Sequence, residues 1–306
     1  MTVCIASRAQ IEDAFICGSV LPVMAGEFRQ GHYVLGIEGL ALLRAGARRD
    51  YSEVDTRTEE MREIISRLGE QPYSEPRDLP EVGVDAGYAQ WADDYDDPGN
   101  DTIALEQPVV QDLLAQFPDG PVLDAACGTG RHAAHLRECG YDEVIGVDSS
   151  EAMLSRARSK LPGVDFRLGE LAALPLEDGQ VVGAVCALAL SHLQEIGPAI
   201  AELARVVRPG GHLVVSNPHP FATAILGWRA VFVDSDGRRS MIPEYPHRHS
   251  DYITAFSDAG FTVRRCIEPP LSGEQARERA KKHRTDAFED ALENVPAVVI
   301  WGVERL

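Results

Sequence analysis

From residue 121 to residue 303, short apolar runs alternate with segments that are long enough to form a helix. Alternation of strand and helix predicts a parallel sheet with helices on both faces. Several of the runs are apolar almost throughout, which is typical of strands covered on both faces. We therefore expect an α/β fold with a doubly wound, mostly parallel, seven-stranded sheet. The expected strands are PVLDA (121–125), EVIGVD (143–148), VDFRLG (164–169), VVGAVCA (181–187), HLVVSN (212–217), FTVRRCI (261–267) and AVVIWGV (297–303).

The first 80 residues follow a different pattern. Apolar residues recur at helical spacing in HYVLGIEGLALL (32–43) and in VDTRTEEMREIISRLG (54–69), so two helices are expected there. Three prolines and two glycines then mark QPYSEPRDLPEVGVDAG (71–87) as a linker. We therefore divide the chain into a helical N-terminal extension, residues 1–80, and a main domain, residues 81–306. A lid over the functional site and a homo-oligomer interface are the two roles expected for the extension.

Charge and apolar content limit the partners and the compartment. The formal net charge of -19 repels phosphate backbones and anionic lipids, so neither nucleic acid nor a membrane is an expected partner. The six cysteines form no CxxC pair, which is typical of free thiols in a reducing cytoplasm. Residues 14–26 resemble the core of a secretion signal, but Glu12 and Asp13 stand where such a signal carries positive charge. The longest apolar run, 181–190, is shorter than the ~20 residues of a membrane span.

The stretch VLDAACGTGRHA (122–133) combines a glycine turn with an acid. Gly128, Gly130 and Ala133 match the G-x-G-x-x-A pattern of loops that hold a dinucleotide pyrophosphate, although so short a match is weakly specific. Asp124 argues against that ligand, because a carboxylate opposes the positive helix end that a pyrophosphate needs. An acid beside the turn suits a ligand with an ammonium and a sulfonium group and no phosphate, such as S-adenosylmethionine.

Five segments in this order resemble the class I S-adenosylmethionine-dependent methyltransferases, in particular small-molecule enzymes of the type 11/25 group. They are DAACGTG (124–130), EVIGVDSS (143–150), FRLGELAALPL (166–176), CALALSHL (186–193) and RVVRPGGHLVVSN (205–217). The resemblance covers roughly residues 85 to 306. It implies the Rossmann-like methyltransferase fold, S-adenosyl-L-methionine as the cofactor and S-adenosyl-L-homocysteine as its product.

The resemblance also implies which residues hold the cofactor. Asp148, at the expected end of the second strand, would accept hydrogen bonds from both ribose hydroxyls. Glu170 would accept from the adenine amino group, where the family commonly has an aspartate, and Leu171 would offer its backbone amide to the ring. The full set is Tyr88, Asp124, Ala126, Gly128, Gly130, Asp148, Ser149, Glu170, Leu171 and Ala187. For the two glycines the alternative is tight packing of strand on helix, and for Asp124 and Asp148 it is capping of the helix that follows.

Histidines are the candidates for the chemical step. A hydroxyl acceptor must lose a proton, and histidine suits a general base because its ordinary pKa is about 6.5. His192 and His219 are the preferred catalytic pair, since both follow strand ends near the transferred methyl group. His247 and His249 are expected in the pocket wall or at a helix start, and no metal site is predicted. For each histidine the alternative is a hydrogen bond to a loop carbonyl.

Three other segments have two interpretations each. Tyr88, Trp91 and Tyr95 share a helical face, which predicts either a lid over the cofactor or an aromatic stripe packed on the core. Residues 221–250 form a long insertion that either covers the acceptor pocket or packs a satellite core. The basic segment ARERAKKHR (276–284) is expected to be a solvated helix face, with a site for an anionic substrate group as the alternative.

These observations predict an S-adenosylmethionine-dependent methyltransferase that acts on a small organic molecule, at a hydroxyl with a histidine general base. A nicotinamide-dependent oxidoreductase on a related sheet is the first alternative, and Asp124 and Glu170 argue against it. A non-catalytic cofactor-binding or regulatory subunit is the second alternative, in which the N-terminal helices serve as an interface.

Overall fold

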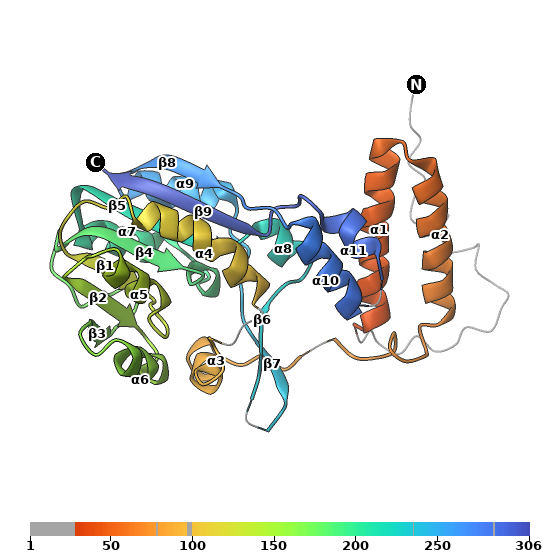
Figure 1. Ribbon diagram of the computed structural model, residues 1–306, viewed down its shortest axis with the longest axis horizontal. Helices are drawn as coiled ribbons and strands as arrows, with labels where there is room; N and C mark the ends of the chain where they lie inside the picture. The colour runs from red at the N-terminus through yellow and green to blue at the C-terminus, as the bar shows by residue number, and fades with distance from the viewer. Residues whose placement is uncertain (1–27, 78, 97–99, 235, 284) are drawn as a thin grey trace, which may run out of the picture.

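The computed structural model describes residues 28–77, 79–96, 100–234, 236–283 and 285–306. Residues 14–26, considered above as a secretion signal, lie outside these ranges. A seven-stranded sheet occupies one end of the molecule, and helices from early and late parts of the chain occupy the other (Figure 1). Among the described helices, none combines the length and the apolar character that crossing a membrane requires.

The sheet is the one that the apolar runs predict. Its strands are β1 (Val122–Ala125), β2 (Val144–Asp148), β3 (Asp165–Leu168), β4 (Val181–Ala187), β5 (Val207–Pro218), β8 (Phe261–Ile267) and β9 (Val298–Arg305). They lie in the order β3-β2-β1-β4-β5-β9-β8, and all neighbours are parallel except β9, which is antiparallel to β5 and β8. The prediction of a mostly parallel, seven-stranded sheet is therefore confirmed. The strand order reverses between β1 and β4, and ligands of open α/β sheets bind beyond the carboxyl ends at such a point.

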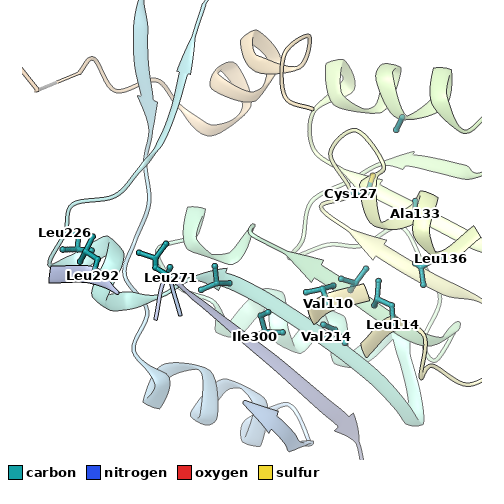
Figure 2. Close-up of a cluster of buried hydrophobic side chains, with 14 of the residues drawn as sticks. Val110, Leu114, Cys127, Ala133, Leu136, Val214, Leu226, Leu271, Leu292 and Ile300 are labelled. Atoms are coloured by element: carbon teal, nitrogen blue, oxygen red, sulfur yellow. The ribbon is translucent and has the colours of Figure 1, made fainter. Parts of the chain in front are cut away.

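Helices cover both faces of the sheet. One face packs on α4 (Asp101–Leu114), α5 (Arg131–Glu138) and α6 (Glu151–Lys160), and the other on α7 (Gly197–Val206) and α9 (His249–Asp258). Successive strand residues point to opposite faces, so Val214 of β5 joins Leu114 and Ile300 on the first face (Figure 2). Its neighbours Leu213 and Val215 join the core on the second face. Full burial of each large side chain contributes about 1.5–3 kcal/mol, which makes this double core the main support of the sheet.

The N-terminal extension contains the two predicted helices, α1 (Gln30–Arg48) and α2 (Tyr51–Ser66). α2 begins before the predicted start at residue 54, because the Asp50 side chain accepts a hydrogen bond from the Glu53 amide (3.1 Å) and caps the helix. It ends at Ser66, before the predicted end at residue 69. α1 packs against α11 (Ala287–Leu292), which in turn packs against α10 (Gly273–His283). The extension therefore contacts helices from the far end of the chain. The division at residue 80 stays a prediction.

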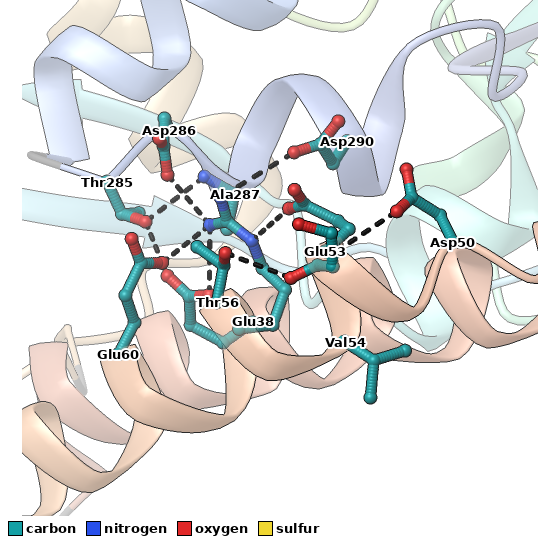
Figure 3. A network of polar contacts seen from close by, with 12 residues as sticks. Glu38, Asp50, Glu53, Val54, Thr56, Glu60, Thr285, Asp286, Ala287 and Asp290 are labelled. Carbon is teal, nitrogen blue, oxygen red and sulfur yellow. Dashed lines mark hydrogen bonds and ion pairs between the residues drawn. The ribbon is translucent and has the colours of Figure 1, made fainter.

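One buried arginine joins these helices. The Arg57 side chain of α2 is only 3% exposed and pairs with Glu38 of α1 (3.2 Å) and with Asp286 at the start of α11 (2.7 Å). Figure 3 shows that the carboxylates of Glu53, Glu60 and Asp290 turn toward the same guanidinium. Burial alone would lower the pKa of Arg57, but the hydrogen bonds that Arg57 donates to Asp286 and Glu53 raise it overall. We call this set the Arg57 cluster.

A hairpin that the sequence did not predict lies in the insertion 221–250. It consists of β6 (Ala230–Val233) and β7 (Arg239–Ile242) and packs on α3 (Val84–Trp91). A Cβ on Gly87 of α3 would lie 2.7 Å from Ile242 Cγ1, so only glycine permits this approach. The insertion also contains the short helix α8 (Pro220–Ala224), and a 3-10 turn, η3 (Leu190–His192), follows β4. Figure 1 shows α3 and the hairpin together, to one side of the sheet.

Candidate active site

A cavity of about 320 Å³ lies at the carboxyl ends of β1, β2 and β4. We call it the cofactor cavity. All of the predicted cofactor residues except Asp124 and Gly130 line it, namely Tyr88, Ala126, Gly128, Asp148, Ser149, Glu170, Leu171 and Ala187. The fold therefore brings these residues to one place, at the point where the strand order reverses. Their individual contacts with a cofactor stay predictions.

Three residues of this cavity have backbone conformations in the left-handed region. They are Ala126 (φ 56°), Gly128 (φ 53°) and Leu188 (φ 55°). Glycine adopts this conformation freely, but a residue with a Cβ loses about 1–3 kcal/mol in it. Ala126 and Leu188 directly follow β1 and β4. Strained backbone of this kind clusters at ligand sites, so these two strand ends support the location of the site.

Asp148 ends β2 and faces the cofactor cavity. Its Oδ2 accepts a hydrogen bond from the Gly128 amide and its Oδ1 from the Ser150 amide, each at 2.8 Å. Burial raises the pKa of Asp148, and these two hydrogen bonds oppose that rise. Each carboxylate oxygen keeps a further lone pair, so two ribose hydroxyls can donate to Asp148 without displacing either amide. The chemistry of this wall therefore fits an adenosyl ligand.

Asp124 and Gly130 lie beneath the loop rather than at the cavity. Asp124 is 1% exposed, and its Oδ2 accepts a hydrogen bond from the Ala133 amide in the first turn of α5 (2.8 Å). Burial raises the pKa of Asp124 to about 7. Gly130 (φ 85°) precedes α5, and a Cβ there would lie 3.2 Å from both Leu161 and Phe166. The structure shows that Asp124 supports the start of α5, that Gly130 allows close packing, and that neither lines the cofactor cavity. Direct contact of either residue with the cofactor stays a prediction.

A second cavity of about 370 Å³ adjoins the first. Tyr88, Tyr95, Leu188 and His192 line both cavities and form their common wall. The other lining residues are Trp91, Asp94, Asn100, Thr102, Pro218, Trp228, Arg229, Ala230, Val231, Glu244 and Arg279. Most of these come from the segment around α3 and from the insertion, so the insertion does contribute to a pocket beside the cofactor cavity.

The common wall contains a hydrogen-bonded pair, Tyr88 and His192. His192 Nδ1 lies 2.7 Å from the Pro243 carbonyl oxygen, which can only accept, so Nδ1 carries the hydrogen of the neutral ring. His192 Nε2 therefore presents its lone pair, and the Tyr88 hydroxyl donates to it at 2.7 Å. Burial lowers the pKa of His192, and the bond to Pro243 opposes this only in part. His192 is thus a neutral ring with an oriented basic nitrogen.

The aromatic side chains near α3 meet although they do not share one helix. α3 ends at Trp91, and Tyr95 lies beyond it. The ring centroids of Trp91 and Tyr95 are 5.1 Å apart, and those of Tyr88 and Trp91 are 6.1 Å apart. Asp93 and Asp96, in the same segment, pair with Arg156 and Lys160 of α6. Ion pairs with α6 therefore hold this segment beside the cofactor cavity, which Tyr88 and Tyr95 line. Its function as a lid stays a prediction.

His219 lies apart from His192. Its Nε2 is 2.9 Å from Glu268 Oε1, which also lies 2.9 Å from His249 Nε2, and neither cavity has His219 among its described lining. The potential ligand atoms of His219, His249 and Glu268 lie within 4.8 Å of one another, a spacing that is compatible with binding of a metal ion. However, His219 Nδ1 accepts a hydrogen bond from the Phe221 amide (3.1 Å), so Nε2 holds the proton of the neutral ring. His219 Nε2 therefore donates a hydrogen bond to Glu268 and has no lone pair available for a metal ion between these three residues.

The structure also adds residues that sequence reasoning missed. Arg229 and Glu244 line the second cavity, and both lie in the insertion, which has no periodic pattern to place them. Arg279 also lines this cavity, and the concentration of basic residues in 276–284 is the sequence feature that could have indicated it. His247 and His249 take structural positions: His247 Nε2 bonds to the Leu193 carbonyl (2.8 Å), and His249 begins α9.

Comparison with known proteins places this site among methyl-transferring enzymes. Residues 123–215 match a family described as a methyltransferase domain. An uncharacterized methyltransferase of Emericella nidulans is 32% identical over 233 residues, which cover 63% of this chain and 79% of that protein. A probable S-adenosylmethionine-dependent methyltransferase of Mycobacterium tuberculosis is 35% identical over 202 residues, covering 65% of this chain and 69% of that protein.

A solved structure has the same fold. The S-adenosylmethionine dependent methyltransferase from Mesorhizobium loti superimposes with a TM-score of 0.52 at 22% identity, covering 66% of this chain and 98% of that chain. Other curated relatives match over shorter stretches, and the chain spans 36%, 64% and 53% of the length of three of them.

Proposed function

Because the chain belongs to the S-adenosylmethionine-dependent methyltransferases, we propose that it methylates a small organic molecule that binds in the second cavity. The observation that carries this proposal is the common wall of the two cavities, formed by Tyr88, Tyr95, Leu188 and His192. A molecule in the second cavity would meet the cofactor beside these residues, where the two cavities adjoin. Cavities of about 300 Å³ or more suit small organic ligands.

The residues around the cofactor cavity fit the family's cofactor, S-adenosylmethionine. When bound, this group supplies a methyl group on a positively charged sulfonium. Asp148 would hold the ribose hydroxyls, and the loop from Ala126 to Gly128 would lie against the ribose and methionyl parts. Glu170 and Leu171 would hold the adenine. These roles are supported by the shared cavity and by the free lone pairs of Asp148.

We propose a hydroxyl as the acceptor group and His192 as the general base. A hydroxyl must lose its proton during attack, and His192 Nε2 is a neutral, oriented acceptor in the common wall. Tyr88 already donates to that nitrogen, so the proton of the acceptor would reach His192 in place of the Tyr88 proton or through the Tyr88 oxygen. We propose no catalytic role for His219, because it donates to Glu268 outside both cavities.

The assembly and the compartment remain proposals as well. Cys127, Cys139, Cys186 and Cys266 are free thiols, which supports the cytoplasm as the location. The N-terminal helices are proposed as a homo-oligomer interface. Their exposed apolar side chains support this, for example Leu43 (71% exposed) and Ile65 (56% exposed).

The central test is the affinity for S-adenosylhomocysteine, measured by titration calorimetry. Asp148→Ala is expected to weaken binding at least about 10-fold, because it removes acceptors for two buried donors. Asp112→Ala on the exposed side of α4 is the matched control and should leave the affinity unchanged. A folded Asp148→Ala protein with wild-type affinity would contradict the proposed site.

A further inference from the structure

The second cavity is lined by cationic side chains. The protein has 29 lysine and arginine residues against 48 aspartate and glutamate residues. Nevertheless, two arginines line this one cavity, Arg229 from the insertion and Arg279 from α10. The two arginines are 50 residues apart in the chain, and β8 lies between them in the sequence. Two guanidinium groups from distant segments of the chain therefore line the same cavity.

Arg229 is held in place by the backbone. Its Nη1 donates to the Thr223 carbonyl and to the Trp228 carbonyl, each at 2.7 Å. Among the described residues, no carboxylate lies within 4.0 Å of Arg229. The guanidinium is therefore oriented by neutral partners. An arginine fixed in this way presents its remaining donors as a planar fork, which matches the oxygens of a carboxylate or a phosphate.

Arg279 and Trp228 extend the same surface. The Arg279 guanidinium carbon lies 3.8 Å from the centroid of the Trp228 ring, a cation–π contact. Trp228, Trp91, Tyr88 and Tyr95 also line the cavity. The wall thus combines flat aromatic faces with positive charge at one end, and a planar molecule with one anionic group has the matching shape and charge.

Two acids, Asp94 and Glu244, also line the cavity. Asp94 is exposed and faces solvent as well as the cavity. Glu244 is half-buried, and loss of solvent around its carboxyl raises its pKa to about 7 although Arg229 opposes the rise. A large share of Glu244 is therefore protonated near neutral pH. A protonated carboxyl can donate a hydrogen bond to an anion rather than repel it.

We infer that the methyl acceptor of this enzyme carries an anionic group, a carboxylate or a phosphate, that Arg229 holds in the second cavity beside Trp228 and Arg279. The inference rests on the proposed function, because it takes the second cavity as the acceptor site. It names a chemical class of acceptor, a planar organic anion. It also gives the basic segment 276–284 a contact with that acceptor through Arg279.

Binding of simple probes tests the inference without knowledge of the natural acceptor. Phenyl phosphate and benzoate are titrated into the protein, with benzyl alcohol as the neutral probe and benzylamine as the cationic probe, both with and without S-adenosylhomocysteine. Ligand-observed NMR gives each Kd. At least one anion is expected to bind with a Kd of about 1 mM, and benzyl alcohol and benzylamine about 10-fold or more weakly. The tighter of the two anions assigns phosphate or carboxylate.

Variants connect the selectivity to one residue. Arg229→Gln is expected to weaken binding of the preferred anion about 10-fold, and Arg229→Lys, which keeps the charge but loses the fork, to have an intermediate effect. Arg264→Gln is the control, because Arg264 is an exposed β8 residue paired with Glu304 outside the cavity. Thermal unfolding of each variant checks that the fold is intact. If Arg229→Gln lowers the stability of the protein, the affinity of the Arg229→Lys variant for the preferred anion decides whether Arg229 holds that anion.

Three outcomes would overturn the inference. They are equal or tighter binding of benzyl alcohol or benzylamine, no binding of either anion up to about 10 mM, and anion binding that neither Arg229 variant changes. Absence of S-adenosylhomocysteine binding would instead contradict the proposed function, while the titrations without it would still decide whether the cavity selects anions. The two failures are therefore distinguishable.

Discussion

At the scale of single residues, Asp124 is a buried acid that supports the start of α5 beneath the glycine loop. Its carboxylate is buried under the loop and bonds to the Ala133 amide. Burial raises its pKa to about 7 in the folded protein, against an ordinary value of about 3.8. The folded state therefore binds more protons than the unfolded state between these two values, and stability falls as the pH rises through this window.

Asp124→Asn should remove that pH dependence. Asparagine keeps an oxygen that accepts from the Ala133 amide but has no charge to desolvate. We expect the free energy of unfolding to rise at pH 8, by at most about 4 kcal/mol, and to change little near pH 4.5. Urea unfolding at both pH values measures this. Asp112→Asn, an exposed change on α4, is the control, and a pH profile parallel to wild type would contradict the argument.

The sequence identified residues at strand ends well and residues of irregular segments poorly. Asp148 and Ala187 could be placed because each ends an apolar run, and the carboxyl ends of parallel strands share one edge of the sheet. Arg229 and Glu244 could not, because no periodicity orients a side chain within the insertion. His219 also follows a strand end, but its ring turns to Glu268, a partner 49 residues away in sequence.

At the scale of elements, the Arg57 cluster joins α1, α2 and α11 by one buried charge. Arg57 satisfies five carboxylates, and Glu38 among them is fully buried. Removal of the cation leaves the buried Glu38 with a hydrogen bond from Thr285 but no opposite charge, and an uncompensated buried charge is strongly destabilising. Figure 1 shows α1, α2 and α11 at the end of the molecule away from β1 and β2, which carry predicted cofactor residues, so loss of the cluster should weaken the helical group and spare the site.

Arg57→Met is therefore expected to lower the free energy of unfolding by roughly 2–3 kcal/mol, measured by urea unfolding at pH 7. Arg62→Met on the same helix is the control, because Arg62 forms an exposed pair with Glu59 that contributes less than about 1 kcal/mol. The affinity of the folded Arg57→Met protein for S-adenosylhomocysteine should stay at the wild-type value. Equal stability of the two variants would argue against the cluster as a fastening point.

Elements were predictable where burial is continuous. The seven strands of the main sheet lie between two layers of helices, so several are apolar almost throughout and stand out in the sequence. β6 and β7 are four-residue strands that are buried at only some positions, and an arginine begins β7. A short, partly exposed hairpin has no such signal, and its position depends on its packing against α3.

At the scale of the whole molecule, the net charge of -19 acts on every ligand. S-adenosylmethionine carries one more positive charge than S-adenosylhomocysteine, because demethylation removes the sulfonium charge. An acidic protein attracts the charged form over distances of about a Debye length, and salt screens this attraction. The charge of the chain therefore favours the methyl donor over its product, beyond any contact inside the cavity.

Salt should reduce that preference. When NaCl rises from about 20 mM to about 200 mM, we expect the Kd of S-adenosylmethionine to increase roughly two- to fivefold, and that of S-adenosylhomocysteine to change less. Titration calorimetry with both ligands at both salt concentrations measures the difference. Identical salt dependence of the two ligands would show that the surface charge has no influence on cofactor binding.

The common wall of the two cavities makes their occupants thermodynamically linked. Tyr88 and His192 face both spaces, so a molecule that shifts this pair on one side alters the surface offered on the other. Such coupling is reciprocal: one ligand changes the affinity for the second by the same factor as the second changes the affinity for the first. If the second cavity holds the acceptor, the Tyr88–His192 contact is therefore the place where donor and acceptor would alter each other's affinity.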